Sequence, residues 1–210
     1  MVGQKQLFLE IEQHLLKDKK PSNYLEKLYD NPIFKQHPFE MLYVLKETEQ
    51  SPKYHPEGNV WNHTMLVVDK AAQVRENSKN QRVFMWAALL HDIGKPLTTR
   101  KRKGRITSYD HDKAGAKLTE KFLLVFTEEE KFISGVCGLV NYHMQILYVV
   151  KGLSFADIDN MKRNVDIGEV ALLGLCDRLG RGKENLEEEK ENITEFLHKC
   201  GLKTDILNHV

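Results

Sequence analysis

The chain has 210 residues, and its 31 Lys and Arg side chains nearly balance its 30 Asp and Glu side chains, for a formal net charge of +1. This balance excludes a strong overall field that would draw the molecule onto nucleic acid or an anionic membrane, so any recognition of anions must be local. The length fits one large domain, with or without a small appendage, and suffices for a substantial core.

Cysteine usage and hydropathy bear on the compartment. The three cysteines, Cys137, Cys176 and Cys200, are widely spaced and odd in number, which argues against a disulfide framework. No apolar run approaches the roughly 20 residues needed to span a bilayer, and residues 1–20 lack the apolar core of a signal peptide. We therefore expect a soluble, cytoplasmic protein without membrane contact, whose oligomeric state the sequence does not determine.

Apolar residues recur at helical spacing along most of the chain. In chain order the pattern predicts helices around residues 7–15, 61–72, 83–90, 118–125 and 133–140. The prolines fall almost wholly in the first 60 residues, which indicates short helices joined by turns there. We predict an all-α bundle of about eight or nine helices, with a helical segment over 1–50 packed on a main domain over 51–210.

Strand signals are confined to two short segments. The loop from Pro96 to Tyr109 can hold a hairpin around Lys103-Gly104, and the β-branched run Ile146–Val150 is too short to assign. Neither would make a sheet-based fold. The charged residues 183–191 are interpreted as the solvated face of a late helix.

One apolar helix ends in two ligand-type residues. His91 and Asp92 follow Trp86–Leu90 and precede Gly94 and Pro96. Imidazole and carboxylate groups at the buried end of an apolar helix need partners. Neighbouring helical side chains point about 100° apart, so both can address one ion only near the helix end, where Gly94 stops the helix.

An ion held by nitrogen and oxygen needs further ligands. The chain offers His63 on the preceding amphipathic helix and Asp177 on a later apolar helix. His111 and His143 stand at the start and end of two more predicted helices. Each residue alone is more often a hydrogen-bonded core residue or a helix-terminal residue. Together they predict a binuclear site, in which Asp92 bridges one ion held by His63, His91 and Asp177 and a second held by His111 and His143.

The arrangement H…HD…D, here His63, His91-Asp92 and Asp177, resembles the HD superfamily of metal-dependent phosphohydrolases. The likeness is closest to the HD domains of bacterial CCA-adding tRNA nucleotidyltransferases. It runs through residues 37–39, 51–64 and 91–96, and resumes at 109–111, 115–116 and 176–182.

The nucleotidyltransferase head has no counterpart in the sequence, because Asp157-Ile158-Asp159 falls in a helical, surface stretch and not on a strand. We therefore expect a free-standing HD domain, and CCA polymerisation is not carried over. The resemblance implies divalent-metal hydrolysis of phosphoesters, often on nucleotides, cyclic phosphates or RNA ends.

Phosphoester hydrolysis near neutral pH needs a hydroxide, which two ions about 3.5–4 Å apart can generate from a bridging water. Besides Asp92, we predict catalytic roles for Lys95, facing the hydroxide or a phosphate oxygen, and for Arg178, binding phosphate. A surface or structural cation is the alternative for both.

Predicted substrate-binding residues are Arg181, Arg105 in the basic loop 100–105, and His55. His55 and the nearby Glu57 could instead orient metal ligands or form a turn, and the basic loop could simply be solvated.

Mixed imidazole and carboxylate ligands suit Mn, Fe, Ni or Co, with Mg as a further option. The expected partner is a phosphorylated small molecule or nucleotide, with RNA as an alternative. Two rival functions are a di-iron oxygenase, since some HD-superfamily members resembling myo-inositol oxygenase use this ligand set, and a nucleotide- or RNA-binding module with little turnover. The complete ligand set argues against the second rival.

Overall fold

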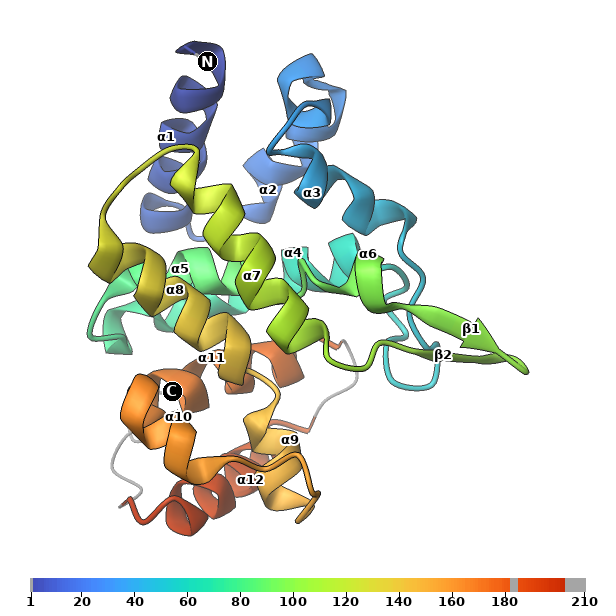
Figure 1. Cartoon of the computed structure of the whole chain (residues 1–210), viewed down its shortest axis with the longest axis vertical. Coiled ribbons are helices and arrows are strands. Elements are labelled where there is room, and N and C mark those ends of the chain that lie inside the picture. Colours follow the sequence, from blue (N-terminus) through green and yellow to red (C-terminus); the bar gives the residue numbers. More distant parts are fainter. Residues whose placement is uncertain (1, 182–184, 203–210) are drawn as a thin grey trace.

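The structure is a computed structural model that describes residues 2–181 and 185–202. This part of the chain is helical apart from one two-stranded hairpin (Figure 1). The α-helices are α1 (Val2–Lys17), α2 (Ser22–Leu25), α3 (Glu40–Tyr43), α4 (Val60–Val74), α5 (Gln81–Leu90), α6 (Lys95–Thr98), α7 (His111–Leu124), α8 (Glu130–Tyr142), α9 (Gln145–Val150), α10 (Ile158–Asn164), α11 (Ile167–Leu179) and α12 (Leu186–Lys199). Eight of these have seven or more residues, so the all-α prediction is confirmed.

After the 16-residue helix α1, the chain up to residue 50 forms short helices, as the prolines indicated. After α1 and α2 the chain makes the 3-10 turns η1 (Glu26–Asp30), η2 (Pro32–Lys35) and η3 (Val44–Glu47), and a fourth, η4 (Arg75–Asn77), follows α4. Phe8 of α1 stacks on Trp86 of α5 with ring centroids 4.5 Å apart. The Trp86 indole donates a hydrogen bond of 2.9 Å to Glu12. The N-terminal segment thus shares its core with the helices that follow.

Helix α5 lies at the centre of the bundle (Figure 1), where it contacts α1, α4, α8 and α11. Every residue from Val83 to Leu90 is buried, as is every residue of α11 from Ile167 to Asp177 except Glu169. A helix that is apolar on all sides is stable only when neighbours surround it. Polar residues at the ends of these two helices therefore lie in the interior.

The predicted hairpin is present. Strands β1 (Arg100–Arg102) and β2 (Arg105–Thr107) pair antiparallel. The two turn residues, Lys103 and Gly104, have φ of 48° and 75°, which is the positive-φ pair of a type I′ turn that matches the twist of the strands. Ile146–Val150, which the sequence left open, is helical as part of α9, because Ile146 and Val149 are buried in the core.

The stretch Glu130–Val150, which holds α8 and α9, is long and apolar enough by composition to cross a membrane. This differs from the expectation that no run approaches that length. Half of the stretch is buried within the protein, where α8 packs along α5 and α7, so its hydropathy is weak support for a membrane span.

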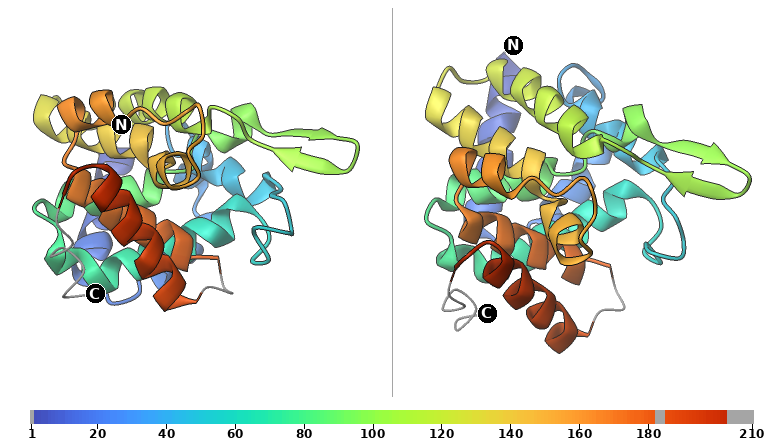
Figure 2. Two further views of the ribbon diagram at one scale, coloured as in Figure 1. Left: turned by 90° about the horizontal axis from the view of Figure 1, so that it is seen from below. Right: turned by 60° about the horizontal axis from the view of Figure 1, so that its bottom comes forward.

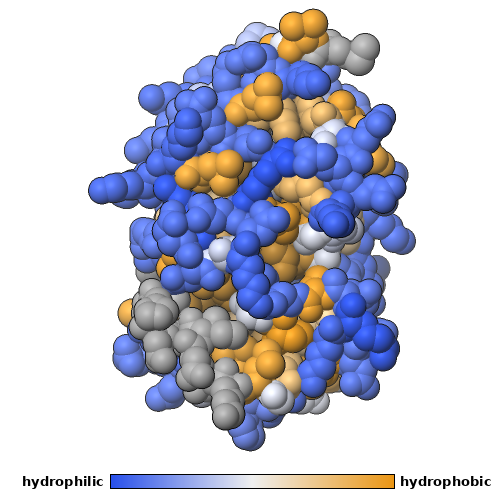
Figure 3. All heavy atoms as spheres, turned by 90° about the vertical axis from the view of Figure 1, so that its left-hand side faces the viewer, coloured by the Kyte–Doolittle hydropathy of each residue, from blue (hydrophilic) through white to orange (hydrophobic). Residues whose placement is uncertain are grey.

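The face at the left of Figure 1 is largely hydrophilic, with smaller hydrophobic areas between polar side chains (Figure 3).

Two predicted surface segments are found as expected. Asp157 caps α10 by accepting a hydrogen bond from the Asn160 amide, and Asp157 and Asp159 are exposed. Residues 185–188 at the start of α12 are exposed too. Gly182 of the sequence motif and residues 183–184 of the charged stretch lie outside the described residues.

Candidate metal centre

Five segments bring six ligand-type side chains into one buried cluster. α4 supplies His63, the turn directly after α5 supplies His91 and Asp92, α7 begins with His111, His143 follows α8, and Asp177 comes from α11. None of the six residues is more than 6% exposed. Residues up to 114 positions apart in sequence therefore meet in the interior, and all six candidate ligands are together.

The two carboxylate oxygens of Asp92 face different histidines. Oδ2 lies 3.3 Å from His91 Nε2 and 3.8 Å from His63 Nε2. Oδ1 lies 3.4 Å from His111 Nε2 and 3.9 Å from His143 Nε2. The donor atoms thus form two potential metal-binding groups that share Asp92. The arrangement has the geometry of the predicted binuclear site.

Asp177 joins the first of these groups through His63. Its Oδ1 lies 2.9 Å from His63 Nε2. This contact stands on the Oδ2 side of Asp92, away from the pair His111 and His143. The structure therefore groups Asp177 with His63 and His91.

Backbone contacts fix the tautomers of three histidines. The Nδ1 atoms of His91, His111 and His143 lie 2.8, 2.6 and 2.7 Å from the carbonyl oxygens of Ala88, Ser108 and Val140. A carbonyl can only accept, so each Nδ1 carries the hydrogen and a neutral ring keeps a lone pair on Nε2. All three lone pairs are then free to bind a metal.

Those lone pairs face other acceptors. The Nε2 atoms of His111 and His143 are 3.2 Å apart. His91 Nε2 has no hydrogen-bond partner among the described residues and faces a carboxylate oxygen. Buried acceptors set against one another are unfavourable unless a proton or a cation lies between them. The donor set therefore fits metal ions on both sides of Asp92.

The ionisation states of the side chains in the cluster also fit metal binding. Burial would raise the pKa of Asp92, but the Lys95 ammonium and His91 hold it well below its ordinary value. Burial would also raise the pKa of Asp177, which Arg181 and His63 hold well below its ordinary value. Burial lowers the pKa of His111 to about 3. Ionised carboxylates and a neutral His111 are the forms that bind metal, whereas Asp177 and Glu57 raise the pKa of His63 despite its burial, so a metal ion bound there would displace a proton.

Glu57 supports His63 from the side opposite the cluster. Its Oε1 lies 2.9 Å from His63 Nδ1 and 2.8 Å from His55 Nδ1, and its side chain is 5% exposed. A carboxylate on the distal nitrogen of a ligating histidine fixes the ring and raises its basicity. His55, predicted to bind substrate, is thus held against Glu57, and the contact fits the alternative role of orienting a metal ligand.

Lys95 contacts the cluster directly. Its Nζ lies 2.6 Å from Asp92 Oδ2 and donates a hydrogen bond to Gln50 Oε1. Lys95 is 7% exposed, so its ammonium offsets the buried negative charge of the shared carboxylate. Gln50 was missed in the sequence, because a single amide in a loop carries no pattern that foretells burial.

The two arginines near Asp177 differ from expectation. Arg178, predicted to bind phosphate in catalysis, pairs with Glu189 of α12. Successive side chains of a helix diverge by about 100°, so the residue after an inward-facing Asp177 points elsewhere. Arg181 Nη2 instead lies 3.1 Å from Asp177 Oδ2. Arg178 is therefore engaged by α12, and Arg181 is the arginine that contacts the cluster.

The sequence matches the family profile of the HD domain over residues 60–182, which is more than half of the chain. The chain belongs to the HD domain family. Similar proteins include the multifunctional CCA proteins of Mannheimia succiniciproducens (37% identity, 91% of this chain, 47% of the relative), Pasteurella multocida (27%, 91%, 46%) and Hahella chejuensis (29%, 87%, 42%). This HD domain spans about half the length of the curated relatives it matches, and the resemblance seen in the sequence is confirmed.

In this HD domain the turn after α5 meets the start of α7 backbone to backbone. A Cβ atom on Gly94 would lie 2.1 Å from the carbonyl oxygen of His111 and 2.6 Å from the amide nitrogen of Gly115. Only a residue without a side chain permits this approach. Gly94 therefore sets the separation between Asp92 and His111.

Gly94→Ala should consequently lower the free energy of unfolding by about 1–3 kcal/mol, the usual cost of overpacking, and should weaken metal binding at His111. Chemical denaturation and metal analysis measure both effects. Gly115→Ala is the graded comparison, because its Cβ would first meet Val140 Cγ1 at 3.2 Å and should cost less. Equal stability and metal content in Gly94→Ala and the unmodified protein would contradict this account.

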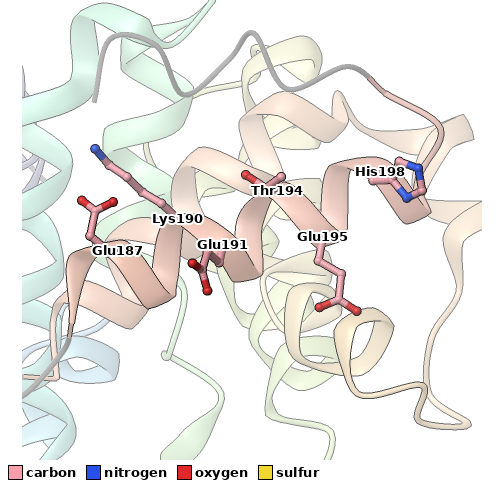
Figure 4. A pocket seen from close by; sticks show the side chains of 6 residues that line it. All are labelled: Glu187, Lys190, Glu191, Thr194, Glu195 and His198. Carbon is pink, nitrogen blue, oxygen red and sulfur yellow. The ribbon is translucent and has the colours of Figure 1, made fainter.

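A hollow on the outer face of α12 is separate from the metal centre. Figure 4 shows the side chains that line it, all projecting from that one helix: Glu187, Lys190, Glu191, Thr194, Glu195 and His198. None of them belongs to the cluster. The outer face of α12 is therefore not a second candidate for the active site.

Proposed function

We propose that this HD domain is a divalent-metal phosphohydrolase that acts on phosphomonoesters or phosphodiesters of nucleotides, 2′,3′-cyclic nucleotides or RNA ends. The observation that carries the proposal is the placement of His63 and His91 on one side of Asp92, and of His111 and His143 on the other. Two ions on a shared carboxylate, of Mn, Fe, Ni or Co and with Mg as a further option, suit this donor set.

When bound, such ions would supply a hydroxide at neutral pH and offset the charge of the phosphate oxygens. The protein's own part is positional. Asp92 presents one oxygen to each side, and Lys95 keeps that carboxylate ionised. Arg181 Nη2 lies 3.1 Å from Asp177 Oδ2, and its buried Nε has no hydrogen-bond partner among the described residues, so the guanidinium retains a donor for a substrate phosphate. The chemistry is independent of molecular oxygen.

The test is a panel of phosphomonoesters and 2′,3′-cyclic nucleotides, assayed in air and under strict anaerobiosis. We expect equal turnover in both, because the nucleophile derives from water. Protein loaded with Ni²⁺ in place of iron should also turn over, and the phosphate product should contain oxygen from isotopically labelled water.

Two results would favour the rival functions. Turnover that required oxygen, or that appeared only with iron, would support the di-iron oxygenase. No turnover on any phosphoester, together with tight nucleotide binding, would support a binding module.

A further inference from the structure

The hairpin of β1 and β2 is built into the rim of the metal centre. It follows α6, which begins at Lys95, and it ends just before His111. At its base the hydroxyls of Thr99 and Ser108 lie 2.8 Å apart, and the Ser108 carbonyl holds His111 Nδ1. From this base the hairpin projects out of the helical body in every view (Figures 1 and 2). Its orientation is thus tied to the candidate ligands.

The hairpin concentrates positive charge in a molecule that is nearly neutral overall. Residues 95–107 contain no acidic residue, whereas five of the six residues 100–105 are Arg or Lys. Lys101 is neutralised by Glu49 at 2.9 Å, and Arg100 Nη1 donates to the carbonyl oxygens of Leu97 and Thr99. Lys101 thus connects the hairpin to the loop before α4, and Arg100 holds the base of the hairpin.

The charges farther out lack such partners. Arg102 and Arg105 are exposed and stand directly opposite each other in the register. Among the described residues neither forms an ion pair with an acidic side chain. Like charges at facing positions destabilise a pair of strands, and an isolated two-stranded ribbon is only marginally stable. The arrangement becomes favourable when an anion binds across the two guanidinium groups.

The length of the hairpin indicates the size of that anion. A strand rises about 3.3 Å per residue, so Arg102 lies roughly 10 Å beyond Thr99 at the base. A nucleoside monophosphate or a cyclic mononucleotide with its phosphate at the metal centre has no second phosphate to place there. A strand with repeated phosphates does.

We propose that the β1–β2 hairpin binds the phosphate backbone of a polynucleotide whose end occupies the metal centre. This rests on the proposed function and narrows its substrate class from free nucleotides to nucleic-acid ends. Arg102 and Arg105 contact backbone phosphates one or more nucleotides away from the reacting end. Such contacts add affinity without reading sequence.

The test compares the full chain with two double variants that each remove two positive charges. Arg102→Gln/Arg105→Gln changes the hairpin and leaves the Lys101 contact and the turn in place. Lys121→Gln/Lys131→Gln is the matched control, since both lysines are exposed and lie on α7 and α8. Fluorescence anisotropy with labelled RNA and DNA strands of about ten nucleotides, at several salt concentrations, reports binding without need of turnover.

For the hairpin variant we expect the Kd of the strand to rise roughly tenfold at low salt, and the slope of log K against log salt to become shallower by about 1.4, or about 0.7 per lost phosphate contact. The ratio of kcat/KM for a strand with a 2′,3′-cyclic end to that for a cyclic mononucleotide should fall by a similar factor. Thermal unfolding should not occur at a lower temperature, because a like-charge repulsion is removed. The control variant should match the unmodified chain in each measurement.

Several outcomes would overturn the hairpin assignment. They are an unchanged Kd and salt slope in the hairpin variant, equal losses in both double variants, or an equal fall in kcat/KM for the strand and the mononucleotide. If polyglutamate displaces the labelled strand as well as an unlabelled strand of equal charge does, the hairpin binds an acidic protein partner instead. If the Kd of the hairpin variant rises for RNA strands alone, the hairpin binds RNA. If it rises for DNA strands alone, the hairpin binds DNA. Failure of the unmodified chain to hydrolyse any phosphoester would contradict the proposed function, while the anisotropy data would still decide the role of the hairpin.

Discussion

Asp92→Ala is expected to remove both metal ions together and to abolish phosphoester hydrolysis. Asp92 is the only residue shared by the two potential metal-binding groups around it, and each of its oxygens faces a separate pair of histidines. Loss of the metal's stabilisation of the transition state, several kcal/mol, corresponds to a fall in kcat of about 1000-fold or more. Metal analysis of the purified variant and turnover of a phosphoester measure the two effects.

Asp159→Ala is the control for this change, since Asp159 is exposed on α10 and should leave metal content and rate as they are. Asp92→Ala also leaves the buried Lys95 ammonium without the carboxylate it pairs with, which should destabilise the fold. Circular dichroism must therefore show that the variant is folded. Asp92→Asn keeps the shape of the side chain and should lose metal as well. A folded variant that retained two ions and full turnover would rule out the shared-carboxylate site.

His111→Ala and His143→Ala are each expected to leave about one ion per chain in a folded, helical protein. The two imidazoles face each other and Asp92 Oδ1, whereas His63, His91 and Asp177 lie on the other side of the carboxylate. Removing one imidazole should therefore empty only the nearer site. Activity should fall strongly in both variants, because the charge stabilisation that the second ion gives the phosphate oxygens is lost.

His198→Ala serves as the comparison, because His198 lies on the exposed face of α12 (Figure 4) and should leave two ions bound. Metal stoichiometry by mass spectrometry under native conditions separates zero, one and two ions per chain. Two ions retained in His111→Ala or His143→Ala would show that the second site lies elsewhere. Loss of both ions would show that the two sites fill cooperatively.

The sequence was informative about the candidate site wherever residue type and helix position acted together. His91 and Asp92 at the end of an apolar helix, and Asp177 at the end of another, had to be interior because those helices are apolar on all sides. The neighbouring arginines show the limit of this reasoning. Arg178 is adjacent to Asp177 in sequence but pairs with Glu189, while Arg181 reaches the carboxylate. Helical rotation sets the direction of a side chain, but the partner in that direction depends on how α12 packs.

By itself, the sequence determined the all-α class, the helices α1, α4, α5, α7 and α8, the hairpin turn and the ligand-type residues, because periodicity and turn chemistry are local properties of the chain. Only the tertiary structure decided which ligand faces which oxygen of Asp92, and that Glu57 and Gln50 reach His63 and Lys95. Those contacts join segments far apart in sequence. They depend on the separation and rotation of packed helices, such as the close approach at Gly94, which no local pattern encodes.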